Sequence, residues 1–267
     1  MTDPTPIAAQ PRQESTDPDT DARRRLDPDH VLTTLHATMT RPESAVALLT
    51  GTWRAVPADA DQAWLRRLCD LGTQLATTLP TSLLLATAFR HAAQTLRAHG
   101  LLHLAAIQGM HELAIHRLHD DNPDATAAAL HDLAQTYRAQ HRLHKIIGCA
   151  DETLETYLLH HHDTGAARTL HHLGALMIEA GRHDSAVKYL TRADTKYRHA
   201  FTTTERAHGL AALGQALWLS GKHAPAHRAF NRALALTVGI DDLAAQQFRA
   251  LAARPDDLAR SPLRRFP

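Results

Sequence analysis

The chain has 267 residues, enough to bury a substantial core as one elongated domain or two smaller ones. Its 29 Lys and Arg residues nearly balance 28 Asp and Glu residues, and the net charge of +1 excludes a global field that would attract nucleic acid or an anionic membrane. Hydrophobic residues make up 44% of the chain but aromatic residues only 4%, and Ala and Leu dominate, so the composition predicts an all-α fold.

The first 27 residues are rich in Pro, Asp, Thr and Gln, with too few large apolar side chains to offset their ordering entropy. We therefore expect residues 1–27 to be a disordered leader. Residues 28–254 read as one helical-repeat domain, because amphipathic stretches alternate with short breaks. Residues 255–267 form a basic tail. The predicted helices begin and end at about 30–40, 43–56, 59–78, 82–98, 101–119, 124–140, 143–160, 164–180, 183–199, 203–220, 223–237 and 240–254.

Nothing in the sequence indicates secretion or membrane insertion. Cys69 and Cys149 are too few for a disulfide framework. The start of the chain lacks the basic and apolar regions of a secretory signal, and no apolar stretch approaches the roughly 20 residues of a membrane span. We expect a cytoplasmic protein that does not contact a membrane.

Two segments of the chain match one another almost residue for residue, 40 positions apart. Small residues are needed where two helices cross, large apolar residues fill the space around them, and a glycine between helices reverses the chain. A repeat of this period predicts stacked helix pairs rather than a catalytic domain with one deep pocket. The matching residues are Leu173, Gly174, Gly181, Ala186, Leu190 and Ala193, followed by Leu213, Gly214, Gly221, Ala226, Phe230 and Ala233.

These residues resemble the tetratricopeptide repeat, and the resemblance implies a right-handed solenoid of antiparallel helix pairs. The clearest repeats are 127–158, 167–198 and 207–238. The first of them matches only in part, because Ile146 stands where the second helix should have a small residue. A weaker match covers about 86–117. The step of 40 residues exceeds the usual repeat of about 34, and this longer variety resembles the repeats of bacterial regulators.

The resemblance also implies that the first helix of each pair lines a concave groove where ligands bind. The groove positions of this sequence carry Arg, His and Gln but no acid. Guanidinium and amide groups are suited to hold carboxylates and an extended peptide backbone, and an indole stacks on apolar side chains. The predicted ligand-binding residues are Arg90, Gln94, Arg97, His131, Gln135, Arg138, Arg168, His171, Gln215 and Trp218.

Histidines are concentrated in the segment from His160 to His162, which Asp163 follows, and again at His171 and His172. Histidine and aspartate are zinc ligands. At a helix end, however, consecutive side chains point in different directions, and the helix dipole favours histidine there without a metal. The chain also lacks a glycine-rich phosphate loop and a nucleophile elbow. We therefore expect no metal, no cofactor and no catalytic residue.

The sequence thus predicts a non-catalytic regulatory or adaptor module that captures an acidic or extended peptide segment of a partner protein in its groove. Two alternatives stay open: part of a ligand-sensing transcriptional regulator that binds a small molecule, and an accessory protein or enzyme of a biosynthetic pathway. A homodimer also stays open. Direct nucleic-acid binding is not expected, because the only bases on the exposed face of the first two helices are Arg41 and Arg54.

Overall fold

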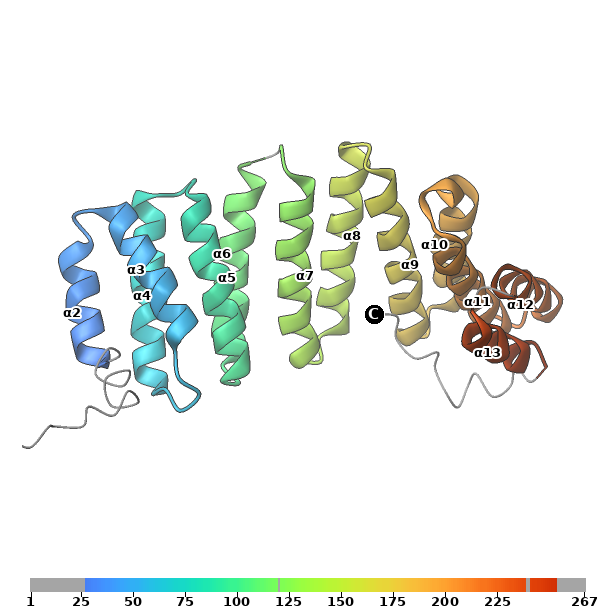
Figure 1. Ribbon diagram of the computed structural model, residues 1–267, viewed down its shortest axis with the longest axis horizontal. Coiled ribbons are helices and arrows are strands. Elements are labelled where there is room, and N and C mark those ends of the chain that lie inside the picture. The colour runs from blue at the N-terminus through green and yellow to red at the C-terminus, as the bar shows by residue number, and fades with distance from the viewer. Residues whose placement is uncertain (1–26, 120, 239–240, 254–267) are drawn as a thin grey trace, which may run out of the picture.

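The computed structural model describes residues 27–119, 121–238 and 241–253, and within these ranges the chain consists of helices and turns without a strand. The helices form an elongated row from α2 to α13 (Figure 1). This confirms the predicted all-α helical-repeat solenoid. Residues 1–26 of the predicted leader and the tail 255–267 lie outside the described residues. The helices are α2 Pro28–Thr38, α3 Pro42–Ala55, α4 Gln62–Thr78, α5 Leu83–Ala98, α6 Leu102–Arg117, α7 Pro123–Ala139, α8 Leu143–Leu159, α9 Asp163–Glu179, α10 His183–Lys196, α11 Thr203–Leu219, α12 His223–Thr237 and α13 Asp242–Ala253, with a 3-10 turn η1 at Arg198–Ala200.

Helix starts follow local capping signals in the sequence. Proline opens α2, α3 and α7, where its missing N–H costs nothing. The Ser82 hydroxyl accepts the N–H of Leu85 at the start of α5. Thr202 and Glu205 form a reciprocal capping box at the start of α11. These caps explain why the helix bounds could be predicted to within a few residues.

One helix is shorter than predicted. The stretch 183–199 was expected to be continuous, but α10 ends at Lys196 and the 3-10 turn η1 follows. Tyr197 lies between them with φ −114° and ψ 20°, and its side chain is buried. Burial of this ring bends the chain and brings Phe201 onto α9, where it stacks on His171.

The helix pairs α9–α10 and α11–α12 are each packed through a glycine and a large residue sixteen positions later. A Cβ atom placed on Gly174 would lie 2.5 Å from the side chain of Leu190, and one on Gly214 would lie 2.6 Å from that of Phe230. Both large side chains are almost fully buried. The small positions of the repeat therefore let the large side chain of the partner helix reach the backbone, as the sequence pattern predicted.

The apolar core is divided along the row into successive clusters, the first from α2 to α6, the second from α6 to α10 and the third from α9 to α13. Helix α6 contributes to both of the first two clusters, with Ala105 and Ile115 on one side and Ala106 and Leu113 on the other. None of the described helices has the length and apolar character needed to cross a membrane.

Candidate binding groove

An open groove with a volume of about 420 Å³ runs across α7, α8 and α9. Helix α8 packs against both α7 and α9. Helices α7 and α9, which are the first helices of their pairs, contact each other less than α5 contacts α7 or α9 contacts α11. The groove therefore opens where two first helices are spread apart. Its lining residues are Asp124, Ala127, Ala128, Leu130, His131 and Ala134 of α7, Ile146, Cys149, Ala150, Thr153 and Tyr157 of α8, and His162, Thr164, Gly165, Arg168, Thr169 and His172 at the start and along α9.

The hollow arises from one missing large side chain. The positions equivalent to Ala150 in the next two repeats are Leu190 and Phe230, which fill the space between their paired helices. In the pair α7–α8 the methyl group of Ala150 stands in place of these large side chains, opposite another small residue, Ala134. Ile146 stands where the repeat normally has a small residue, and its side chain fills only part of the space between the two helices. The alanines thus leave an apolar recess in a repeat whose neighbours are filled.

Polar groups stand at the α8–α9 end of the groove. The Tyr157 hydroxyl donates to Asp124 Oδ1 at 3.0 Å, and its ring stacks on His162 with the ring centroids 5.0 Å apart. The Nδ1 atom of His162 in turn accepts the Gly165 N–H at 3.0 Å and caps α9. Burial, followed by the neighbouring Asp124, raises the pKa of Tyr157 to about 12, so the phenol is a neutral donor at neutral pH.

Two of the predicted ligand-binding residues lie in this groove. His131 projects from α7, where its Nε2 lies 3.2 Å from the Gln135 amide nitrogen. Arg168 projects from α9 and donates from Nε and Nη2 to Glu205 Oε1 at 3.1 and 3.0 Å. Its side chain is 64% exposed, so this surface ion pair costs little to exchange for another carboxylate.

The groove also contains His172, which the repeat register did not select. Desolvation by the surrounding protein lowers its pKa, and the charges of Arg138 and His131 lower it further. The imidazole is therefore neutral at pH 7 and offers both a donor and an acceptor. One signal in the sequence could have located this side of the groove. Ala150 is much smaller than Leu190, the residue at the equivalent position of the next repeat.

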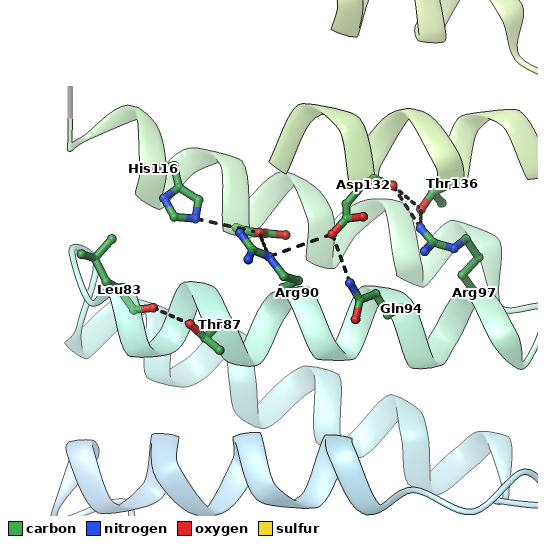
Figure 2. A network of polar contacts seen from close by, with 9 residues as sticks. Leu83, Thr87, Arg90, Gln94, Arg97, His116, Asp132 and Thr136 are labelled. Atoms are coloured by element: carbon green, nitrogen blue, oxygen red, sulfur yellow. Dashed lines mark hydrogen bonds and ion pairs between the residues drawn. The ribbon is translucent and has the colours of Figure 1, made fainter. Parts of the chain in front are cut away.

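The three predicted residues of α5 lie elsewhere, in a polar network between α5, α6 and α7 (Figure 2). Arg90 Nε donates to Glu112 Oε1 at 2.7 Å, and Gln94 Nε2 donates to Asp132 Oδ2 at 3.1 Å. Arg97 Nη1 donates to the Asp132 carbonyl oxygen at 3.1 Å. The predicted positions carry no acid, but oxygen atoms of Glu112 and Asp132 on the adjacent helices already accept hydrogen bonds from these donors.

Glu112 is the buried centre of this network. Its side chain is fully inaccessible, and its second oxygen has no hydrogen-bond partner. Burial raises the pKa of Glu112, whereas the hydrogen bond and charge of Arg90 lower it. His116 lies 3.8 Å away on the same helix, and burial lowers its pKa. This network joins α5 to α6 and α7. It occupies the position between α5 and α7 that corresponds to the open groove between α7 and α9.

The remaining predicted residues are also engaged within the fold. Arg138 lies 3.7 Å from Glu179 of α9. The imidazole of His171 stacks on Phe201 at 4.2 Å between ring centroids, and burial lowers its pKa to about 4. Gln215 is buried in α11.

Trp218 lies at the end of α11, away from the groove. Its indole meets the imidazoles of His223 and His227 edge-on, with centroid distances of 4.1 and 5.4 Å. It is therefore placed beside α12 and is not brought together with His131 and Arg168.

The histidine run at the end of α8 has a structural explanation. The His160 Nδ1 atom lies 2.8 Å from the Thr156 carbonyl oxygen, His161 takes the left-handed conformation of the turn with φ 52°, and His162 caps α9. The three side chains thus serve different positions of one turn. Across the described ranges, no three His, Cys, Asp or Glu side chains gather as a metal site would require.

Comparison with known proteins supports this description. Residues 125–193 match the family model of the tetratricopeptide repeat, a range that covers α8 and α9 and most of α7 and α10. No curated protein matches the sequence. Among solved structures, a putative kinesin light chain from Podosopora anserina with nearly identical TPR-like repeats has a TM-score of 0.51 at 14% identity, covering 75% of this chain and 97% of that one. BtubC (BKLC) from P. vanneervenii has a TM-score of 0.49 at 16% identity, covering 93% and 92%.

Helical-repeat arrays of this kind are typically interaction modules with an extended concave binding surface. The repeat pattern in the sequence, the family match across the groove and the solenoid fold agree. Residues 125–193 thus match the tetratricopeptide repeat, and the described chain has a helical-repeat fold similar to that of TPR-like repeat structures.

Proposed function

We propose that this protein is a non-catalytic adaptor or regulatory module that captures an extended peptide segment of a partner protein in the groove between α7 and α9. The observation that carries the proposal is the recess left by Ala134 and Ala150 in a repeat whose neighbours fill the same space with Leu190 and Phe230. An apolar recess that crosses an otherwise packed row of helices costs packing energy, and a ligand side chain would recover it.

The groups around the recess suit a peptide. Arg168 offers a guanidinium for a carboxylate, and His131 and His172 offer donors and acceptors for a peptide backbone. The groove is partly open to solvent, which suits an extended chain better than a small molecule, since small ligands are usually 70–90% buried. An acidic side chain next to an apolar one is the sequence we expect the groove to prefer.

The thiol in the groove supports binding rather than catalysis. Cys149 is a free, buried cysteine whose pKa burial raises to about 11. It is therefore protonated at neutral pH and forms part of the apolar floor, because the thiolate is the nucleophilic form. Two buried free thiols also fit the reducing cytoplasm in which we place the protein.

The test fills the recess in two ways. A random peptide library is selected against the full-length protein, and the enriched peptides are measured by fluorescence anisotropy. Ala150→Leu restores a large side chain inside the recess, and Ala128→Trp blocks it from an exposed position. Each should weaken binding about tenfold or more, which is about 1.4 kcal/mol. Ala235→Trp, at an exposed position of α12, should leave binding unchanged.

Charge is tested separately. Arg168→Gln should weaken the enriched acidic peptides more than their Asn and Gln counterparts, whereas Arg117→Gln, which removes another exposed arginine paired with a glutamate, should not. Equal binding by Ala150→Leu, Ala128→Trp and the unmodified chain would show that peptides bind outside this groove. The proposed function would also be contradicted if the unmodified protein enriched no peptide more strongly than the Ala128→Trp variant does in the same selection.

A further inference from the structure

The positive charge of the chain is concentrated in its last two complete repeats. Residues 182–232 contain nine Lys and Arg residues and three Asp and Glu residues, so this segment carries 9 − 3 = +6 while the whole chain carries +1. The rest of the chain is correspondingly acidic. The small total charge therefore conceals a strongly basic region.

The cations follow the exposed face of α10. Lys188, Arg192 and Lys196 are all exposed and are four residues apart, which places them on one side of the helix at steps of about 6 Å. The buried side of the same helix consists of Ala186, Leu190 and Ala193. The three cations thus form a regular row on the surface opposite the core.

The row recurs in the next repeat. Positions 40 residues further on carry Arg228 for Lys188 and Arg232 for Arg192, both exposed on α12. The turn before each helix carries Arg182 and Lys222 in the same relation. In the preceding repeat, by contrast, the positions equivalent to Lys188 and Arg192 are Gly148 and Glu152 of α8. The array therefore covers two second helices and ends at α8.

The acids of the region are already neutralised. Asp184 pairs with Lys222 at 2.8 Å. Asp194 pairs with Arg206 at 3.1 Å and with Arg232 of α12 at 3.0 Å, and its side chain is only 14% exposed. The ion pair between Asp194 of α10 and Arg232 of α12 also shows that these two helices lie next to each other.

Five cations of the array keep their charge for an external partner. Within the described part of the chain, no ion pair engages Arg182, Lys188, Arg192, Lys196 or Arg228. They belong to the two adjacent second helices and to the turn before the first of them, so a single extended anion can meet all of them.

The face lacks the side chains that a protein partner would need. The exposed large hydrophobic residues of the described chain lie elsewhere, and none belongs to α10 or α12. Protein interfaces depend on buried aromatic or aliphatic anchors, whereas binding to a phosphate backbone depends mainly on lysine and arginine side chains. We infer that the α10–α12 face is a binding surface for the phosphate backbone of a nucleic acid, without readout of its bases. This inference departs from the sequence-based expectation that a chain with a net charge of +1 does not bind nucleic acid.

The experiment uses the full-length protein and fluorescein-labelled RNA and duplex DNA of mixed sequence, measured by anisotropy over a range of salt concentrations. About five phosphate contacts on a single strand predict that log K falls with log salt at a slope of about −3.5. The variant K188E/R192E/R228E should weaken binding tenfold or more at low salt and reduce the slope.

The control variant is R54E/R66E/R67E, which changes the net charge equally at exposed positions of α3 and α4. It should retain most of the affinity, and circular dichroism should show both variants folded. Ala128→Trp should bind nucleic acid normally, which separates this surface from the groove.

Four results would overturn the inference. Equal losses in the two triple variants would show that only total charge matters. Tighter binding to poly-glutamate than to RNA or DNA would indicate an acidic protein partner, and tighter binding to vesicles containing anionic lipid would indicate a membrane surface. Failure of the unmodified protein to bind either nucleic acid at low salt would also refute it.

Discussion

His171 shows how neighbouring elements decide what a side chain does. Its position in the repeat directs it toward the inner side of α9, but Phe201 and the backbone at Gly209 enclose the ring. Gly209 is needed there, because a Cβ atom on it would overlap the imidazole. The residue is therefore a packing element between α9 and α11, although the same position was predicted to contact a ligand.

The burial of His171 has a consequence for acid stability. Its pKa is about 4 in the folded protein against 6.5 as the ordinary value. As the pH falls from 6.5 toward 4, the unfolded chain binds a proton at this residue that the folded chain does not, so the free energy of unfolding decreases. The loss approaches about 3 kcal/mol at pH 4. His171→Phe, which keeps the stack on Phe201, should flatten the pH dependence of urea unfolding in this window.

The matched control is His199→Phe, because His199 is 67% exposed and pairs with Asp163 at the surface. It should leave the slope between pH 6.5 and pH 4 close to that of the unmodified protein. If His171→Phe shows the same slope as this control, then His171 is protonated in the folded state and the buried stack does not exclude the proton.

Within the pairs α9–α10 and α11–α12, a glycine and its large partner determine how closely the two helices approach. We expect Gly174→Ala to destabilise the protein by about 1–3 kcal/mol, since the added methyl group would overlap Leu190. Gly148→Ala should instead stabilise it by about 0.5–1 kcal/mol, since nothing lies within 4 Å of the added atom and alanine is the better helix former. Urea unfolding measures both, and a destabilised Gly148→Ala would contradict this account.

Most of the elements could be predicted from the sequence, because local signals set them. Prolines, Ser82 and the Thr202–Glu205 box mark helix starts, and glycines with positive φ at Gly181 and Gly221 mark turns. The early end of α10 could not be predicted from such signals, because it depends on the burial of Tyr197 by the rest of the fold.

The site was harder to predict, because it depends on two or three helices at once. The register selected His131 and Arg168, which line the groove, but their contact with a ligand stays a prediction. It could not show that Glu112 and Asp132 would reach the arginines of α5 from other helices. Nor could it show His172 beside the recess, since the recess comes from the size of Ala150 in the neighbouring helix.

Across the whole molecule, the α5–α7 junction joins the first apolar cluster to the repeats that follow. Asp132 accepts a hydrogen bond from Gln94 and lies 4.0 Å from Arg90. We expect Asp132→Ala to cost about 1–2 kcal/mol and to speed amide hydrogen exchange in α5 and α7 more than in α11 and α12. Exchange would be followed by mass spectrometry.

Asp184→Ala is the control, because it removes an ion pair whose acid is 75% exposed. Such pairs contribute little to stability, so exchange should be unchanged. Uniformly faster exchange along the chain in Asp132→Ala would show that the row unfolds as one cooperative body, contrary to the separate clusters of its core.

The pairs Gly174–Leu190 and Gly214–Phe230 each lie within a single 40-residue unit. A unit therefore brings this close contact with it. The fit between units is different, because His171 of one unit lies against Gly209 of the next. Tandem duplication of residues 167–206 in the gene would place Thr169 of the second copy against His171 of the first, since Thr169 stands 40 positions before Gly209. Growth of the molecule by one helix pair therefore leaves the contact inside each unit unchanged but requires a glycine at this one position between units.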